Sequence, residues 1–203
     1  MHIPPGIDAF ASSLDGYRKP ATLFWRDDYL DSFRALMRNY GDLVKIAIAG
    51  HTHMDEFRVL TASDVRKAVA FRITPAISPI YKNNPAFSKL NYDIQTGDFT
   101  DINTYYLDQA NSVQTQQWAN EYSFSKVYGY LAFNSENLLT LAERFRKDVA
   151  LRDRYARYYS ALAPLQITSE NWPFYFCAQT AFTRQDFEKS MESLRKHDAR
   201  AEK

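Results

Sequence analysis

The sequence predicts a mixed α/β fold of the α+β type, in which strands come first and helices follow. Short apolar or alternating segments, typical of strands, recur up to about residue 107, whereas from about residue 135 the apolar residues follow a helical period. Of the 203 residues, 45% are hydrophobic and only 6 are glycine, so the chain can bury a core of ordinary size. We therefore expect two regions, residues 1–133 and residues 134–203.

The first region should begin with a helix and continue as strands. Apolar residues at helical spacing predict an amphipathic helix over residues 22–39, closed near Gly41. Residues 43–48 are apolar and β-branched, which is typical of a short buried strand. Residues 56–60 alternate like a half-buried strand, and residues 68–73 are expected to be its neighbour.

Regular structure should stop over residues 74–87, where three prolines each remove a backbone donor and restrict the preceding residue. Strands are expected to resume over residues 88–94 and 104–107, with a turn at residues 96–98 between them.

The second region should be helical. One apolar stripe over residues 138–162 predicts a long helix, whose start Asn134 or Ser135 can cap. Trp172 should open another helical piece, and Thr183 should cap the last helix.

Charge and cysteine content exclude several classes of protein. There are 25 basic and 24 acidic residues, a net charge of +1, so no nucleic-acid binding is expected. The single Cys177 cannot form a disulfide within the chain. No stretch approaches the roughly 18 apolar residues of a membrane span, so no transmembrane segment is expected, and no signal peptide is recognisable.

One short motif points to chemistry. His51 and His53, in Gly50-His51-Thr52-His53, directly follow the predicted strand at residues 43–48, so both imidazoles can project from the carboxyl end of a sheet. Neutral imidazole is a common ligand for zinc, iron and manganese. An H-x-H pair alone is weak evidence, because the two rings of such a pair are more often solvated loop residues than metal ligands.

Three segments together resemble a known family. The sequence contains His2-Ile3-Pro4-Pro5-Gly6, then Gly50-His51-Thr52-His53-Met54-Asp55-Glu56-Phe57, then Asn84-Pro85-Ala86-Phe87. This order is similar to that of the calcineurin-like metallophosphoesterases, and among them of acid sphingomyelinase and the sphingomyelinase-like phosphodiesterases. The match extends over about residues 1–95. The resemblance implies half of a metallophosphoesterase β-sandwich flanked by helices, followed by a helical carboxyl-terminal region.

The same resemblance implies a metal site and a reaction. His2 and His51 would bind one metal and His53 the other, in a site for two divalent ions that are expected to be zinc. The intact protein would then hydrolyse a phosphoester, either lipid or nucleotide-like. Asp55 and Glu56 could orient a ligand histidine, or could only pair with Arg58 or Arg66 at the surface.

Tyr81, Asn83 and Asn84 lie in the proline-rich loop, which by resemblance borders the substrate pocket. A simpler interpretation is that all three only form turns, and it is favoured over a role at the pocket.

Part of the family's pattern cannot be found in this sequence. The family's first half supplies D-x-H, G-D-x-x-D and G-N-H segments, which carry further ligands and the leaving-group acid. Beyond the three candidate ligands the chain has only His197, and Met1 stands where the family has the glycine of G-H-I-P-P-G. We therefore expect a fragment, a mis-assigned start or one product of a split gene, with no catalytic residue in this half and no activity by itself.

Two further expectations follow. The partner of an intact enzyme would be the missing amino-terminal half, and family members are commonly exported. The alternative is a non-catalytic half-domain or interaction module that folds against a partner.

Overall fold

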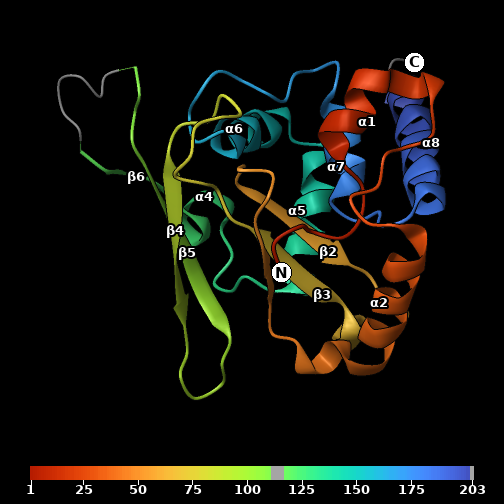
Figure 1. Ribbon diagram of the computed structural model, residues 1–203, viewed down its shortest axis with the longest axis horizontal. Coiled ribbons are helices and arrows are strands. Elements are labelled where there is room, and N and C mark those ends of the chain that lie inside the picture. Colours follow the sequence, from red (N-terminus) through yellow and green to blue (C-terminus); the bar gives the residue numbers. More distant parts are fainter. Residues whose placement is uncertain (111–116, 202–203) are drawn as a thin grey trace.

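The computed structural model of the chain describes the backbone of residues 1–110 and 117–201, and the side chains of these residues except Tyr17 and residues 197–201. It confirms the predicted mixed α/β fold, built from two small sheets and surrounding helices (Figure 1). The last helix contains His197, whose side chain lies outside the described ones.

Each sheet has three strands. The first has the order β1-β3-β2, with β1 parallel to β3 and β2 antiparallel to β3. The second has the order β4-β5-β6 and is antiparallel throughout. The strands are β1 (Ala47–Ala49), β2 (Glu56–Leu60), β3 (Val69–Ile73), β4 (Ala86–Tyr92), β5 (Phe99–Tyr106) and β6 (Ala119–Ser123).

Most of the helices lie around the first sheet, whereas α4 lies against the second sheet, which stands to the left in Figure 1. The α-helices are α1 (Ala9–Asp15), α2 (Asp27–Tyr40), α4 (Phe124–Tyr128), α5 (Ser135–Phe145), α6 (Val149–Tyr159), α7 (Trp172–Ala178) and α8 (Arg184–Ala201). Three short 3₁₀ turns are η1 (Gly16–Arg18), η2 (Gly41–Leu43) and η3 (Val65–Lys67). Within the described residues, no helix is both long and apolar enough to cross a membrane.

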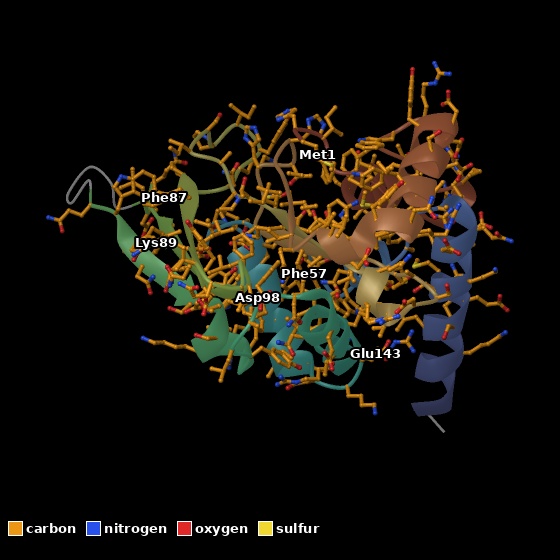
Figure 2. The ribbon with its side chains drawn as sticks, turned by 90° about the horizontal axis from the view of Figure 1, so that it is seen from below. Met1, Phe57, Phe87, Lys89, Asp98 and Glu143 are labelled. Atoms are coloured by element: carbon orange, nitrogen blue, oxygen red, sulfur yellow. The ribbon has the colours of Figure 1, made fainter. Side chains whose placement is uncertain are left out.

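Both faces of the first sheet are covered. Leu30 of α2 packs with Phe71 of β3 on one face, whereas Leu138 of α5 packs with Phe57 of β2 on the other. The Phe57 ring lies 6.2 Å from that of Phe145 and 5.8 Å from that of Tyr155, near the centre of the molecule (Figure 2). All residues of β2 and β3 are therefore buried, and the prediction of a half-buried strand at residues 56–60 was wrong.

A buried polar network joins the two sheets. Arg72 of β3 donates to both carboxylate oxygens of Asp55, which lies just before β2, and also to Ser88 of β4. Thr104 of β5 and Tyr122 of β6 each donate a hydrogen bond of 2.9 Å to the same carboxylate. Burial by itself would lower the pKa of Arg72, but the charge of Asp55 raises it well above its ordinary value.

The helical half differs from the prediction at one place. The stripe over residues 138–162 is divided into α5 and α6, because Asp148 caps α6 by accepting a hydrogen bond from the Leu151 amide. Val149, expected in the apolar stripe, is 57% exposed. Asn134 caps α5 and Thr183 accepts from the Asp186 amide before α8, as predicted.

Cys177 of α7 is fully buried in the main core, and burial raises the pKa of its thiol to about 11. The core containing Cys177 draws on residues from both sides of position 133, and a domain boundary at that position stays a prediction.

Candidate functional site

The chain's first residues lie along the end of β1 and bring His2 to the H-x-H loop. The amino group of Met1 donates to the Ile48 carbonyl over 3.0 Å, and the Gly50 amide donates to the His2 carbonyl over 2.8 Å. These two bonds hold residues 1–2 beside the outer edge of β1, so two segments nearly fifty residues apart meet at its carboxyl end.

The imidazoles of His2 and His51 are in contact. His51 Nδ1 lies 3.4 Å from His2 Nε2, and the rings meet edge to face with centroids 5.2 Å apart. Two nitrogens bound to one tetrahedral zinc, each at about 2.0–2.1 Å, would stand about 3.4 Å apart. The separation of this pair therefore fits two ligands of one ion.

His53 is held differently. Its Nδ1 lies 3.1 Å from the Ser78 carbonyl oxygen, and its ring packs edge to face on Tyr81 with centroids 4.9 Å apart. Since a carbonyl can only accept, Nδ1 is the donor in this contact, and Nε2 is the nitrogen left to face a metal. Fixing the second nitrogen in this way is how proteins orient metal-binding histidines.

The H-x-H loop has an unusual backbone. His51 has a φ of 75° and His53 a φ of 66°, a left-handed conformation that few residues other than glycine adopt. The Thr52 amide donates to the Gly50 carbonyl over 2.9 Å, which helps hold the turn. Each such residue costs on the order of 1–3 kcal/mol, and positions of this kind cluster at functional sites.

His51 lines a cavity of about 660 Å³. The cavity lies between α1, the H-x-H loop, the proline-rich loop and the segment after α6. Exposed apolar side chains stand among its lining residues, namely Phe10, Ile80 and Leu165. Its size is that of a small-molecule site.

A buried ion pair lies at the base of this cavity. Arg58 Nε donates to Glu56 over 2.5 Å, and its Nη1 donates to the carbonyl oxygens of Pro5 and Ile7 over 3.2 and 2.8 Å. Its guanidinium also lies over the Phe24 ring at 5.3 Å, and that ring contacts His51. Arg58 therefore ties the segment that follows His2 to the strand that follows His53.

The structure gives each of the two acidic candidates an arginine partner. Asp55 bonds to Arg72 in the inter-sheet network, and Glu56 bonds to Arg58. Arg66 pairs instead with Asp64. The expected surface pairing was thus wrong in location, because both carboxylates are at least 95% buried.

The three loop candidates divide into one exposed and two buried residues. Tyr81 is 50% exposed and lines the cavity, and Gln166 donates to its carbonyl over 2.6 Å. Asn83 is buried and donates to the Ser78 carbonyl over 3.1 Å, so it shares its acceptor with His53. Asn84 donates to the Ala161 carbonyl over 2.9 Å and so fastens the loop to the segment after α6.

The structure shows a contact between two of the three histidines expected as ligands. His2 and His51 are brought together, and among the described residues no group of three or more histidine, cysteine, aspartate or glutamate side chains is arranged to hold a metal. The sequence analysis named Arg58 only as a surface partner of Asp55 or Glu56, and it did not select Phe24 or Gln166. The alternation Glu56-Phe57-Arg58 is a signal for the pairing of Arg58 with Glu56, since it places two opposite charges on the same face of a strand.

Comparisons with known proteins identify a family for this chain. Residues 64–185 match the family described as the acid sphingomyelin phosphodiesterase C-terminal region. The chain is 28% identical over 171 residues to acid sphingomyelinase-like phosphodiesterase 3b of Homo sapiens, and 27% identical over 168 residues to sphingomyelinase phosphodiesterase D of Dictyostelium discoideum. It is also 27% identical over 169 residues to the cyclic GMP-AMP phosphodiesterase SMPDL3A of Mus musculus.

Each of these alignments covers 78% of this chain and 36% of the relative. The chain therefore spans little more than a third of the length of the curated relatives it matches. Because the family match includes more than half of its residues, the chain belongs to the acid sphingomyelin phosphodiesterase family, of which it carries the carboxyl-terminal part.

Proposed function

We propose that this chain is the carboxyl-terminal half of a metal-dependent phosphoester hydrolase, to which it contributes His2, His51 and His53 as metal ligands. The observation that carries the proposal is the contact of His2 with His51 at 3.4 Å, beside a cavity of about 660 Å³. Membership in a phosphodiesterase-like family supports it.

Two divalent ions, zinc in our proposal, would clamp the phosphoryl group and lower the pKa of a bound water when present. The chain's own residues prepare for such ions. His2 and His51 offer nitrogens at the spacing of two ligands on one ion, and Ser78 fixes the tautomer of His53. The left-handed backbone at both loop histidines holds them before any ion binds.

The substrate we propose is a phosphoester with an apolar or ring-shaped body, either lipid or nucleotide-like. The relatives are named for sphingomyelin and for cyclic GMP-AMP, and both substrates combine a phosphoester with such a body. The exposed Phe10, Ile80 and Leu165 among the lining residues support this choice, because they would contact the body of a substrate whose phosphate lies near His51. Tyr81, between His53 and the cavity, would border the same substrate.

The rest of the site would come from an amino-terminal half, whether joined to Met1 or carried by another chain. The described residues place only two histidines together, and a two-metal site needs more ligands than these. The alternative function is that of a non-catalytic module, in which this chain binds the amino-terminal half without any reaction. The experiment below distinguishes this module from an enzyme.

The test measures zinc binding and hydrolysis with the 203-residue chain. We expect weak zinc binding in calorimetry, lost in His2→Ala and in His51→Ala, and no turnover of a chromogenic phosphodiester above background. His197→Ala is the matched control, since it removes a histidine from α8 and should leave zinc binding unchanged.

Equal zinc binding by His51→Ala and His197→Ala would overturn the ligand assignment. Turnover by the chain alone, abolished by His51→Ala, would show that it carries a complete site. Addition of an amino-terminal half should bring activity, and a stable complex without turnover would identify a non-catalytic module.

A further inference from the structure

Arg58 lies where the segments that carry the three histidines meet. Its side chain is buried and lines the cavity beside His51. It contacts the segment that follows His2, the aromatic ring that packs on His51, and the acidic side chain that follows His53 on β2. One buried cation is therefore connected to the surroundings of all three proposed ligands.

Two hydrogen bonds join Arg58 to the segment that follows His2. Its Nη1 donates to the Pro5 and Ile7 carbonyl oxygens, over 3.2 and 2.8 Å. Gly6, between these two residues, has a φ of 99°, and a Cβ there would lie 3.4 Å from the same nitrogen. Glycine adopts this left-handed backbone without strain, so it permits the turn that presents both carbonyl groups to one donor. Arg58 therefore fixes the course of the chain shortly after His2.

The same guanidinium is tied to the H-x-H loop and to β2. It lies over the Phe24 ring at 5.3 Å, and this ring meets the His51 ring edge to face with centroids 5.7 Å apart. Arg58 Nε donates to Glu56 over 2.5 Å, in the strand that follows His53. A guanidinium has five donors in a rigid planar fork and also stacks on aromatic rings, so one arginine can make all of these contacts.

We propose that Arg58 is a positioning residue of the metal site, which holds His2 against His51 at the separation of two ligands on one ion. The inference rests on the proposed function, in which these histidines bind zinc. Arg58 acts through the segments it joins, in the way that groups around a metal site orient its ligands. Because the two nitrogens already lie 3.4 Å apart, the pair need not rearrange when an ion binds.

The principal test replaces Arg58 by lysine in the 203-residue chain. Lysine keeps a positive charge beside Glu56, but its single nitrogen cannot take the places of both Nε and Nη1, and it lacks the planar group that lies over Phe24. We expect Arg58→Lys to fold and to bind zinc about 10-fold or more weakly than the wild type in calorimetry.

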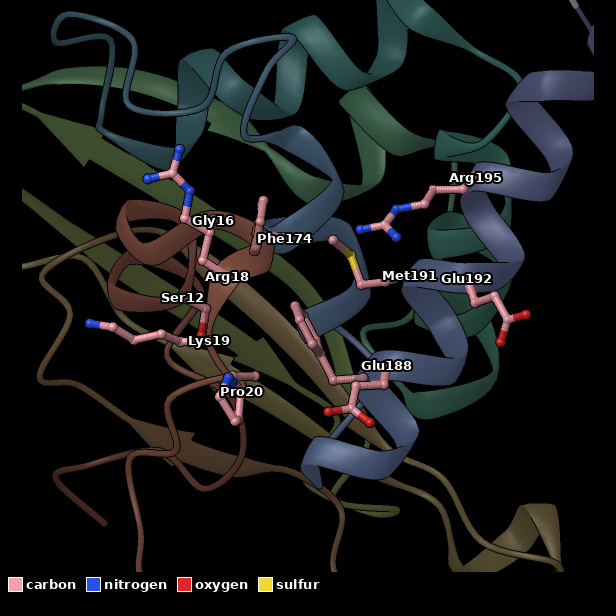
Figure 3. Close-up of a pocket in the computed structure, with 12 residues that line it drawn as sticks. Ser12, Gly16, Arg18, Lys19, Pro20, Phe174, Glu188, Met191, Glu192 and Arg195 are labelled. Carbon is pink, nitrogen blue, oxygen red and sulfur yellow. The ribbon is translucent and has the colours of Figure 1, made fainter.

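Met191→Ala is the control for a general loss of stability. Met191 is buried and lines a separate cavity of about 390 Å³ between α1 and α8, which shares no lining residue with the cavity beside His51 (Figure 3). Its truncation removes buried apolar volume, so stability falls while the histidines keep their surroundings. Met191→Ala should bind zinc as the wild type does, at a temperature where circular dichroism shows every variant to be folded.

A second measurement needs no metal. In a chain with isotope-labelled histidine, nuclear Overhauser contacts between the His2 and His51 rings report whether the two imidazoles touch, and His2→Ala assigns the signal. We expect this ring contact in the wild type and in Met191→Ala, and a weakened or absent one in Arg58→Lys. If the wild type binds no zinc, or His51→Ala binds it as His197→Ala does, the proposed function fails, and the ring contact still decides the role of Arg58.

Three results would overturn the proposal: no ring contact in the wild type, an unchanged ring contact in Arg58→Lys, or a zinc affinity that falls no further in Arg58→Lys than in Met191→Ala. Should Arg58→Lys fail to fold, Phe24→Leu takes its place, because it removes the ring that links the guanidinium to His51. This variant should also weaken the ring contact, and a full contact in it would overturn the proposal as well.

Discussion

Glu121 of β6 has both carboxylate oxygens buried, with no hydrogen-bond partner among the described residues. Burial and the nearby charge of Asp55 raise the pKa of its carboxyl to about 9, against the opposing effect of Arg72. The folded chain thus holds a proton on Glu121 at neutral pH, whereas the unfolded chain, with an ordinary carboxyl pKa of about 4.3, releases it.

This residue should make stability fall as pH rises. Below the pKa that Glu121 has in the unfolded chain, both the folded and the unfolded state bind the proton, so the folded state loses no stability there. Between about pH 4.5 and 9 the folded state binds more protons, and unfolding is favoured by up to about 1.4 kcal/mol per pH unit. We expect Glu121→Gln to remove this loss, so its advantage in urea unfolding should grow from pH 5 to pH 9. A constant difference between the two proteins over that range would contradict the assignment.

Some residues of the candidate site could be predicted from the sequence, and others could not. His51 and His53 could be selected from their spacing after an apolar segment. The closeness of His2 could be anticipated only from family resemblance, because no local pattern reports a contact between residues nearly fifty positions apart. The carbonyl of Ser78, which orients His53, is a backbone group and leaves no mark in the sequence.

Helices and strands whose apolar residues recur at a clear spacing were the ones that the sequence predicted. The helix expected over residues 22–39 is observed as α2, and the strand expected over residues 68–73 as β3. Of residues 43–48, Leu43 ends η2 and only Ala47 and Ile48 belong to β1, because pairing with β3 begins at Ala47. β6 was missed since its sequence, ANEYS, is polar and depends on pairing with β5.

The junction of α2 with η3 should depend on the absence of a side chain at Gly41. A Cβ there would lie 2.2 Å from the Lys67 carbonyl oxygen, a backbone atom that cannot rotate away. Gly41→Ala should therefore lower the free energy of unfolding by about 1–3 kcal/mol, although alanine favours helix by about 1 kcal/mol.

Gly50→Ala is the matched control for this prediction. Its Cβ would meet nothing closer than 3.7 Å, so we expect a much smaller change in urea unfolding. Equal effects at the two positions would show that the close approach to Lys67 is not what requires glycine.

For the whole molecule, the buried network around Arg72 is the chief polar connection described between the sheets. Asp55→Asn removes the negative charge and leaves a buried guanidinium without its counter-ion, so it should destabilise the chain by about 3–5 kcal/mol. Asp64→Asn breaks the exposed pair with Arg66 and should have a much smaller effect, because water and salt screen charges at the surface. The measurement is urea unfolding followed by tryptophan fluorescence, and similar costs for both variants would contradict a structural role for the buried pair.

The buried thiol of Cys177 can also report on how the core opens in solution. At neutral pH almost none of it is thiolate, and its burial in the main core keeps reagents away, so an alkylating agent can react only when the core opens. Because no second cysteine competes for the reagent, the pace of labelling reports how often the interior of this molecule is exposed to solvent.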